Sequence, residues 1–240
     1  MFGFGSRKKG DLPDVPELPR LDAVFVSETG LVRAENQDNA LVSIGHGVFC
    51  VADGVGGGLE GARASAIVCR ELQHMLNASG ATLSERVASV RRSLDAANDV
   101  IADYAASHGY AQMGSTAAAL VFDPLDFSRA AAVHVGDSRV YRVRGGLAEA
   151  LTRDHRAAGT NALTRAVGAG PRLRCDARLI DVRPGDRFVI CSDGVHGVVS
   201  DARLALFASC GGLETAAERL ADAVLRAGAP DNYTFVIVAA

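Results

Sequence analysis

The stretch Phe49-Cys-Val-Ala-Asp53-Gly-Val-Gly-Gly-Gly58 is the part of the sequence around which the fold is organised. The apolar run from Val48 to Ala52 predicts a buried strand, and the glycines after Asp53 predict a sharp turn that exposes the backbone. Glycine lets main-chain atoms approach a ligand closely, so the Asp53 side chain and the Gly54 carbonyl suit the same cation. The alternative is a plain turn, because Asp-Gly pairs after strands are common.

Three further aspartates repeat this pattern at the borders of predicted strands, namely Asp137, Asp193 and Asp231. Carboxylates at strand ends can converge on one rim of stacked sheets, where their repulsion is costly unless cations lie between them. Oxygen ligands without His or Cys favour magnesium or manganese over zinc. Such ions activate water for attack on phosphate esters, and the Arg33 guanidinium suits the phosphate oxygens. For each aspartate taken alone, a turn or helix cap remains the alternative.

Alternation and turn signals predict many short strands and a few amphipathic helices. The strands are expected at residues 21–27, 41–44, 48–52, 114–122, 130–135, 139–143, 147–151, 175–182, 187–192 and 233–238. The strands between 114 and 151 follow one another closely, which indicates an antiparallel meander. Helices are expected at 60–76, at 82–104 behind a Thr82-x-x-Glu85 capping box, after Ser200, and at 213–224. We therefore expect an α+β fold in which sheets pack together between helices.

Length and composition indicate one globular domain over residues 21–240, preceded by a mobile arm at 1–20 that is rich in proline and charge. Hydrophobic residues make up 48% of the 240 residues and the net charge is −3, which argues against nucleic acid or a membrane as partner. The first residues contain no signal-peptide core, so a cytoplasmic location is expected. The five cysteines form no Cys-x-x-Cys pair, which indicates neither a disulfide framework nor a zinc site.

The order of short motifs resembles that of the metal-dependent type 2C (PPM) serine/threonine protein phosphatases, bacterial branch. The resemblance covers about residues 22–240. The motifs that carry it are Arg33-x-x-Asn-Gln-Asp38, Val51-Ala-Asp-Gly-Val-Gly-Gly57, Gly114-Ser-Thr, Val135-Gly-Asp-Ser-Arg139, Leu151-Thr-Arg-Asp-His155, Leu163-Thr-Arg-Ala-Val-Gly168, Cys191-Ser-Asp-Gly194 and Asp231-Asn232.

This resemblance implies a four-layer αββα sandwich of two antiparallel sheets flanked by helix pairs. It also implies a centre of two Mn²⁺ or Mg²⁺ ions, bridged by Asp53 and completed by the Gly54 carbonyl, Asp193 and Asp231. Asp38 would hold water molecules bound to these ions, and Asp137 with Asp193 would form a third, more labile metal site. Arg33 would bind the substrate phosphate.

The implied activity is hydrolysis of phosphoserine and phosphothreonine in proteins by a metal-bridging hydroxide, acting as a monomer and opposing a bacterial serine/threonine kinase. A non-catalytic regulatory module with the same fold is one alternative, and a phosphatase dedicated to one partner-switching regulator is another. Three features depart from the family pattern. Gln37 stands where many members have Glu, Val55 stands where animal members have a proton-donating His, and the flap between His155 and Leu163 is short.

Overall fold

The computed structural model describes residues 21–56, 59–76, 82–160 and 162–240. The strands are β1 (Asp22–Glu28), β2 (Asp38–Ser43), β3 (Val48–Val55), β4 (Gly114–Ser115), β5 (Ala117–Phe122), β6 (Arg129–Val135), β7 (Arg139–Arg144), β8 (Leu147–Ala150), β9 (Asp176–Asp181), β10 (Arg187–Cys191) and β11 (Tyr233–Ala239). The helices are α1 (Leu59–Leu76), α2 (Leu83–His108), α3 (Asp193–His196), α4 (Asp201–Ala208) and α5 (Leu213–Arg226), with a 3₁₀ turn at Ile44–His46.

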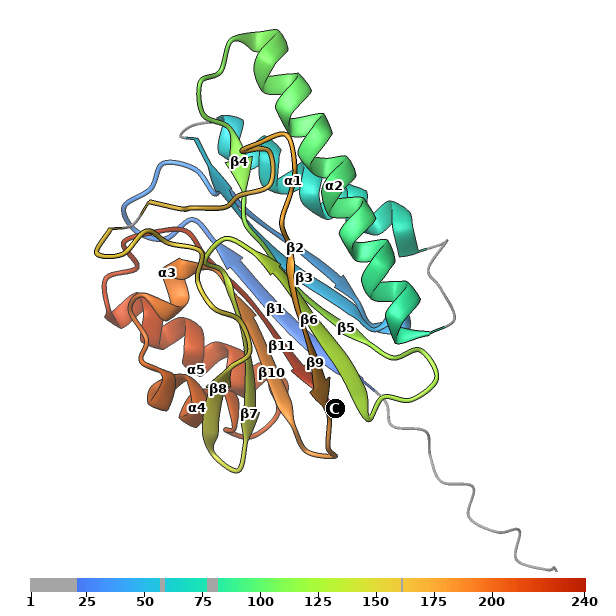
Figure 1. The fold of residues 1–240 in the computed structure, drawn as a ribbon. Coiled ribbons are helices and arrows are strands. Elements are labelled where there is room, and N and C mark those ends of the chain that lie inside the picture. The colour runs from blue at the N-terminus through green and yellow to red at the C-terminus, as the bar shows by residue number, and fades with distance from the viewer. Residues whose placement is uncertain (1–20, 57–58, 77–81, 161) are drawn as a thin grey trace, which may run out of the picture.

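The strands form two antiparallel sheets that pack face to face between two layers of helices (Figure 1). One sheet has the order β1-β11-β10-β7-β8, and the other has the order β2-β3-β5-β6-β9, with β4 paired to β3. Helices α1 and α2 cover the second sheet, while α4 and α5 cover the first. The α+β fold and the four-layer αββα order predicted from the sequence are thereby confirmed.

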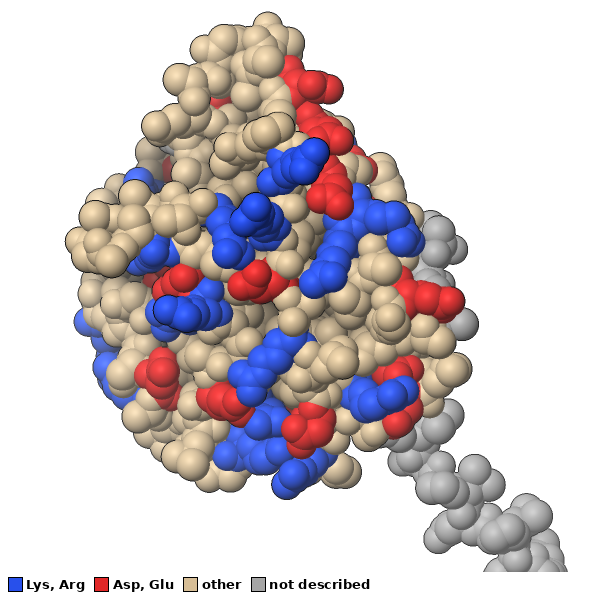
Figure 2. All heavy atoms as spheres, viewed as in Figure 1, with Lys and Arg blue, Asp and Glu red and all other residues tan. Residues whose placement is uncertain are grey.

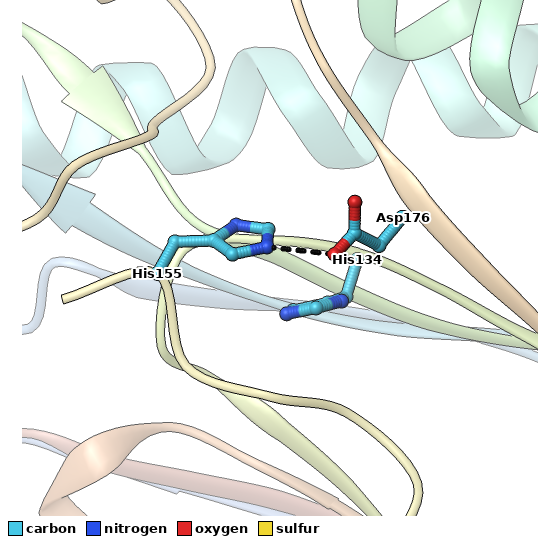
Figure 3. Close-up of side chains that lie close together, drawn as sticks. All are labelled: His134, His155 and Asp176. Carbon is cyan, nitrogen blue, oxygen red and sulfur yellow. Dashed lines mark hydrogen bonds and ion pairs between the residues drawn. The ribbon is translucent and has the colours of Figure 1, made fainter.

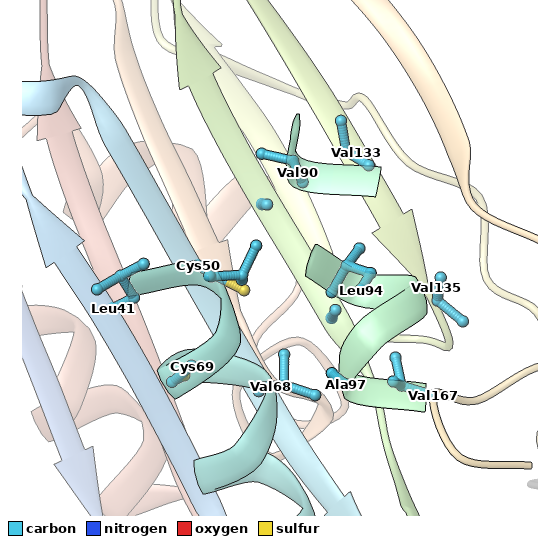
Figure 4. Packing of buried hydrophobic residues seen from close by; sticks show 14 of the residues in the cluster. Leu41, Cys50, Val68, Cys69, Val90, Leu94, Ala97, Val133, Val135 and Val167 are labelled. Carbon is cyan, nitrogen blue, oxygen red and sulfur yellow. The ribbon is translucent and has the colours of Figure 1, made fainter. Parts of the chain in front are cut away.

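Strand β3 reads as a continuous apolar run because both of its faces are buried. Phe49 and Val51 point into the core between the sheets, whereas Val48 and Cys50 point towards the helices. Figure 4 shows the helix side of this sheet, where side chains of α1 and α2 pack onto β3 and β6. Successive side chains of a strand point to opposite faces, so a strand between two packed layers requires apolar side chains on both faces.

Strand β10 repeats the pattern in the other sheet. Phe188 faces the inter-sheet core and meets the Phe122 ring edge-on, with ring centroids 5.7 Å apart and an interplanar angle of 88°. Val189 and Cys191 face the helix layer formed by α4 and α5. β3 and β10 therefore each pack against the inter-sheet core on one face and a helix layer on the other. This packing fixes the positions of the residues at the ends of the two strands.

Helix α2 begins as the sequence predicts. The Glu85 N–H donates to the Thr82 hydroxyl at 3.3 Å, and the Thr82 N–H donates to the Glu85 carboxylate at 3.1 Å. The helix ends at Gly109, whose φ of +71° is readily adopted only by glycine. Among the described residues, none of the helices combines the length and the apolar character that a membrane span needs.

The predicted meander between residues 114 and 151 is wrong. β6 pairs with β5 and β9 in one sheet, while β7 pairs with β8 and β10 in the other, so the chain changes sheets at residues 136–138. Strand alternation indicates which face is buried but not which strand is the neighbour, so the sequence did not reveal this crossover. The strand predicted over 114–122 is also interrupted, at Thr116.

Two local predictions, near Asp53 and at Asp193, also need correction. β3 continues through Gly54 to Val55, so the turn begins later than expected. Asp193 begins the four-residue helix α3, which is too short to show a helical period in the sequence. The mobile arm predicted at residues 1–20 lies outside the described residues, and the domain boundaries at 21 and 240 stay predictions.

Candidate metal centre

Both sheets send acidic residues to one edge of the sandwich. Asp38 on β2 and Asp53 on β3 are directly paired across the strands of one sheet. In the other sheet, Asp193 lies two residues after the end of β10 at Cys191, and Asp231 lies two residues before the start of β11 at Tyr233. Asp137 lies in the crossover between the sheets. The convergence follows from topology, since these strand ends and the crossover meet at the same edge.

These groups surround a single cavity of about 1400 Å³. Four of the predicted site aspartates line it, together with Arg33, Gly54 and Arg156, and its far part reaches α2 and residues 162–171. The aspartates are Asp53, Asp137, Asp193 and Asp231. On the face seen in Figure 2, basic and acidic side chains lie beside one another rather than in separate patches of one sign.

Asp38 lies beneath the cavity and is almost fully buried. Its Oδ2 accepts a hydrogen bond of 2.7 Å from the Ser192 hydroxyl, which joins the two sheets, while its Oδ1 is buried without a hydrogen-bond partner in the described part of the chain. Burial raises the pKa of Asp38 to about 6, although the Ser192 hydroxyl opposes this effect. A buried carboxylate oxygen without a partner is costly, so the arrangement calls for a cation or a water molecule held by one.

Asp53 is the most strongly perturbed acid in the site. Burial and neighbouring negative charges raise its pKa well above its ordinary range. The charges that act on it belong, in decreasing order, to Asp38, Asp193, Asp137 and Asp231. Five carboxylates that repel one another, without a His or Cys lining the same cavity among the described residues, are the donor set of a hard divalent cation. The residues present therefore fit Mn²⁺ or Mg²⁺.

The backbone of Asp53 is held by the segment that interrupts the predicted strand at Thr116. The Thr116 N–H donates to the Asp53 carbonyl at 2.8 Å, and the Asp53 N–H donates to the Thr116 hydroxyl at 2.9 Å. That hydroxyl also hydrogen-bonds the Ser138 hydroxyl at 2.6 Å, next to Asp137 in the crossover. Thr116 of the Gly114-Ser-Thr motif thus connects the backbone of Asp53 to Ser138, the residue after Asp137.

Two glycines explain why Asp-Gly recurs at the ends of β3 and β10. A Cβ at Gly54 would lie 2.1 Å from the carbonyl oxygen of Gly61 in α1, and a Cβ at Gly194 would lie 1.9 Å from that of Asn232. Any side chain would therefore push α1 or the segment before β11 away from the aspartate. Whether the Gly54 carbonyl binds metal stays a prediction.

Arg33 lies at the cavity but pairs with an acid. Its Nε and Nη2 donate to the two carboxylate oxygens of Asp231 at 2.7 and 2.8 Å, while its side chain stays 57% exposed. The Asp231 hydrogen bond is the main reason that the pKa of Arg33 is raised, and Asp193 and Asp53 contribute. A guanidinium that binds two carboxylate oxygens has the geometry to bind two phosphate oxygens. This substrate role of Arg33 stays a prediction.

Sequence reasoning missed three residues that shape the site. Asn232 clamps the loop before β2, because its amide donates to the carbonyls of Thr29 and Glu35 at 2.8 Å and its Oδ1 accepts from the Gln37 N–H at 3.0 Å. Ser192 holds Asp38, as described above. Arg156 pairs with two of the aspartates. Ser192 and Asn232 stand next to motif aspartates in the sequence, which was a usable signal for their role. No comparable signal marked Arg156.

His155 does not lie where it could donate a proton to a leaving group in the cavity. Its side chain is only 7% exposed, and it is not among the residues that line the cavity. Its Nδ1 accepts a hydrogen bond from the Gly136 N–H at 3.1 Å, and its Nε2 contacts the Asp176 carboxylate at 3.1 Å. His155 is therefore a buried residue that braces the crossover.

Comparison with known proteins adds independent information. The protein phosphatase 2C family model matches residues 32–227. The serine/threonine protein phosphatase PstP of Mycobacterium tuberculosis is 32% identical over 232 residues, an alignment that covers 88% of this chain and 43% of that protein. This chain therefore spans less than half the length of that curated relative.

Solved structures agree with this match. PppA, described as a key regulatory component of T6SS in Pseudomonas aeruginosa, has a TM-score of 0.86 and 32% identity, covering 92% of this chain and 98% of that one. The catalytic domain of PstP in complex with two manganese ions has a TM-score of 0.79 and 31% identity, with the same coverages. Because the family model spans most of the described sandwich, the chain belongs to the protein phosphatase 2C family.

Proposed function

We propose that this chain is a manganese- or magnesium-dependent phosphatase that removes phosphate from phosphoserine and phosphothreonine in proteins. The observation that carries the proposal is the convergence of Asp53, Asp193 and Asp231 from two sheets on one cavity that Arg33 also lines. Relatives named serine/threonine phosphatases, such as PstP and the Stp protein of Listeria monocytogenes, support it.

Each residue has a physical task in this proposal. Asp53, Asp193, Asp231 and the Gly54 carbonyl would hold two ions, and Asp38 would accept hydrogen bonds from water between them through its free Oδ1. The bound ions supply Lewis-acid activation of the phosphate and lower the pKa of the attacking water. Burial of Asp38 away from bulk water strengthens its attraction for the cations, since the local dielectric is low.

Arg33 would orient the phosphate at the mouth of the cavity. Its guanidinium is exposed enough to meet an incoming ester, and its planar fork contacts two oxygens at once. Asp231, which would hold a metal ion, is also the partner of Arg33 through two hydrogen bonds. Arg33 would therefore sit beside the metal centre, where its guanidinium would bind the phosphate oxygens.

The shape of the cavity favours a protein substrate. Small-molecule pockets typically enclose about 300–1,000 Å³, and this cavity is larger and extends from the acids to the C-terminal part of α2. An extended segment around a phosphorylated residue fits such a groove. Because one chain supplies the whole lining, we propose that a monomer is active, and that a serine/threonine kinase generates its substrates.

Hydrolysis of p-nitrophenyl phosphate and of a phosphothreonine peptide tests the proposal. Activity should require added Mn²⁺ or Mg²⁺ and should fall by at least about 10²–10³-fold in Asp53→Ala and Asp193→Ala, as expected when charge stabilisation of the transition state is removed. Asp222→Ala, which removes an exposed carboxylate on α5, is the matched control and should keep full activity. Equal rates in all four proteins would refute the proposed function.

A further inference from the structure

The guanidinium of Arg156 lies between two of the cavity's carboxylates. Its Nε donates to Asp137 Oδ2 in a short contact, and its Nη2 donates to Asp193 Oδ2 at 2.7 Å. The Asp137 side chain is 6% exposed, while those of Arg156 and Asp193 are 25% and 32% exposed. One cation thus bridges two acids that come from different parts of the chain.

The backbone places Arg156 there independently of its side chain. Arg156 forms an isolated antiparallel bridge with Leu163, and the Ala157 N–H donates to the Ala162 carbonyl at 2.9 Å. The start of this segment is joined to the crossover that carries Asp137. These backbone contacts place the Arg156 guanidinium beside the acids.

His155 makes that joint. Its N–H donates to the Gly136 carbonyl at 2.8 Å, and its Nδ1 accepts from the Gly136 N–H. Because Nδ1 is an acceptor, Nε2 of the neutral ring carries the proton and donates to Asp176 (Figure 3). Arg165 also contacts Asp176, at 2.9 Å. His155 and its neighbours therefore brace the crossover that carries Asp137.

Electrostatics explains what the bridge does. Asp137 and Asp193 repel each other, and two carboxylates at close range need a positive charge between them. A divalent ion is one solution. A guanidinium with donors on separate nitrogens is another, and it is covalently tethered, so it faces the acids at a high effective concentration.

We propose that Arg156 is a built-in cation that occupies the Asp137–Asp193 pair in place of a third divalent ion. The inference rests on the metal centre of the proposed function and deepens it: the chain would carry two exchangeable ions and one fixed positive charge. Arg156 would then be a positioning residue that keeps Asp193 aligned for its metal. Unlike an exchangeable ion, its positive charge would stay in place when the metal concentration changes.

Counting bound metal tests the proposal directly. The parent, Arg156→Ala and Arg153→Ala are dialysed to equilibrium against Mn²⁺ up to the millimolar range, and bound Mn²⁺ is counted by elemental analysis. Arg153 is an exposed arginine of the same loop and controls for loss of charge. We expect two ions per chain in the parent and in Arg153→Ala, and three in Arg156→Ala. Three ions in the parent, or no gain in Arg156→Ala, would overturn the proposal.

Thermal unfolding without metal separates this inference from the proposed function. Removal of Arg156 leaves two carboxylates without their cation, so the melting temperature of metal-free Arg156→Ala should fall by roughly 5–10 °C. Arg153→Ala should change it little, and Mn²⁺ should restore more stability to Arg156→Ala than to the parent. Equal melting temperatures for the two variants would overturn the role of Arg156, whatever the parent does with phosphate esters. A parent that binds Mn²⁺ but hydrolyses nothing would instead refute the proposed function.

Discussion

Replacing Asp53 by Asn should make the metal-free protein more stable, although it should abolish activity. Burial raises the pKa of the adjacent Asp38 from 3.8 to about 6, and burial with neighbouring negative charges raises the pKa of Asp53 well above its ordinary range. One pKa unit corresponds to about 1.4 kcal/mol, so ionisation of Asp38 alone lowers the free energy of unfolding by about 3 kcal/mol at neutral pH. Asp53→Asn removes a charge that burial and the neighbouring carboxylates disfavour, while it keeps nearly the same shape. The gain in the free energy of unfolding should be at least that of one pKa unit, about 1.4 kcal/mol.

The sign depends on pH in a defined way. A carboxyl group whose pKa is raised by folding favours the native state fully below its unfolded pKa, and this contribution is lost as the pH rises through the folded pKa. The advantage of Asp53→Asn over the parent should therefore be larger at pH 7.5 than at pH 5, shrink as the pH falls, and vanish near pH 4. For a chain of this size, about 1.4 kcal/mol corresponds to a melting temperature higher by roughly 3–6 °C at pH 7.5.

Urea and thermal unfolding in the presence of a chelator, followed by circular dichroism at these pH values, measure the effect. Asp222→Asn on the exposed face of α5 is the control and should show no such pH dependence. Added Mn²⁺ should reverse the order, since a ligand at 100 times its Kd stabilises by about 2.7 kcal/mol and only the parent keeps the bridging carboxylate. A variant that is less stable than the metal-free parent at pH 7.5, by the same amount as at pH 5, would refute the account of buried repulsion.

Three further substitutions test other parts of the structure. Gly194→Ala places a Cβ 1.9 Å from a backbone oxygen and should lower both stability and metal affinity, whereas Gly45→Ala, with open space around it, should do neither; equal thermal shifts would contradict this packing. Phe188→Ala should lower the free energy of unfolding in urea by about 3–5 kcal/mol because it empties the inter-sheet core, while Phe25→Ala, 56% exposed, should cost less than about 1 kcal/mol. Arg33→Lys loses the fork and should raise KM for a phosphopeptide more than it lowers kcat, which steady-state kinetics will show; an unchanged KM would exclude Arg33 from phosphate binding.

The strands and helices were largely predictable because burial leaves periodic traces in the sequence. The run from Val48 to Ala52 and the run from Phe188 to Cys191 are apolar at every position, as strands between two packed layers must be. Thr82 and Glu85 marked the start of α2 through local chemistry alone. In each case the deciding interactions lie within a few residues or on one strand.

Pairing between distant segments was not predictable in the same way. Asp137 was expected in a turn between neighbouring strands, yet it lies where the chain changes sheets, because β7 pairs with β10 rather than with β6. Arg156 escaped notice because its two acidic partners are 19 and 37 positions away. Nothing local distinguishes such an arginine from a solvated one, so only the folded topology reveals its position.

The central claim is that Asp53, Asp193 and Asp231 bind a pair of divalent cations at the edge where the two sheets meet. Anomalous diffraction from crystals of this chain soaked with Mn²⁺ tests it most directly. The account predicts two strong manganese peaks in the cavity, with the Asp53 carboxylate between them and Asp193 and Asp231 on one of them. Manganese peaks at other residues, or none at this edge of the sandwich, would contradict it.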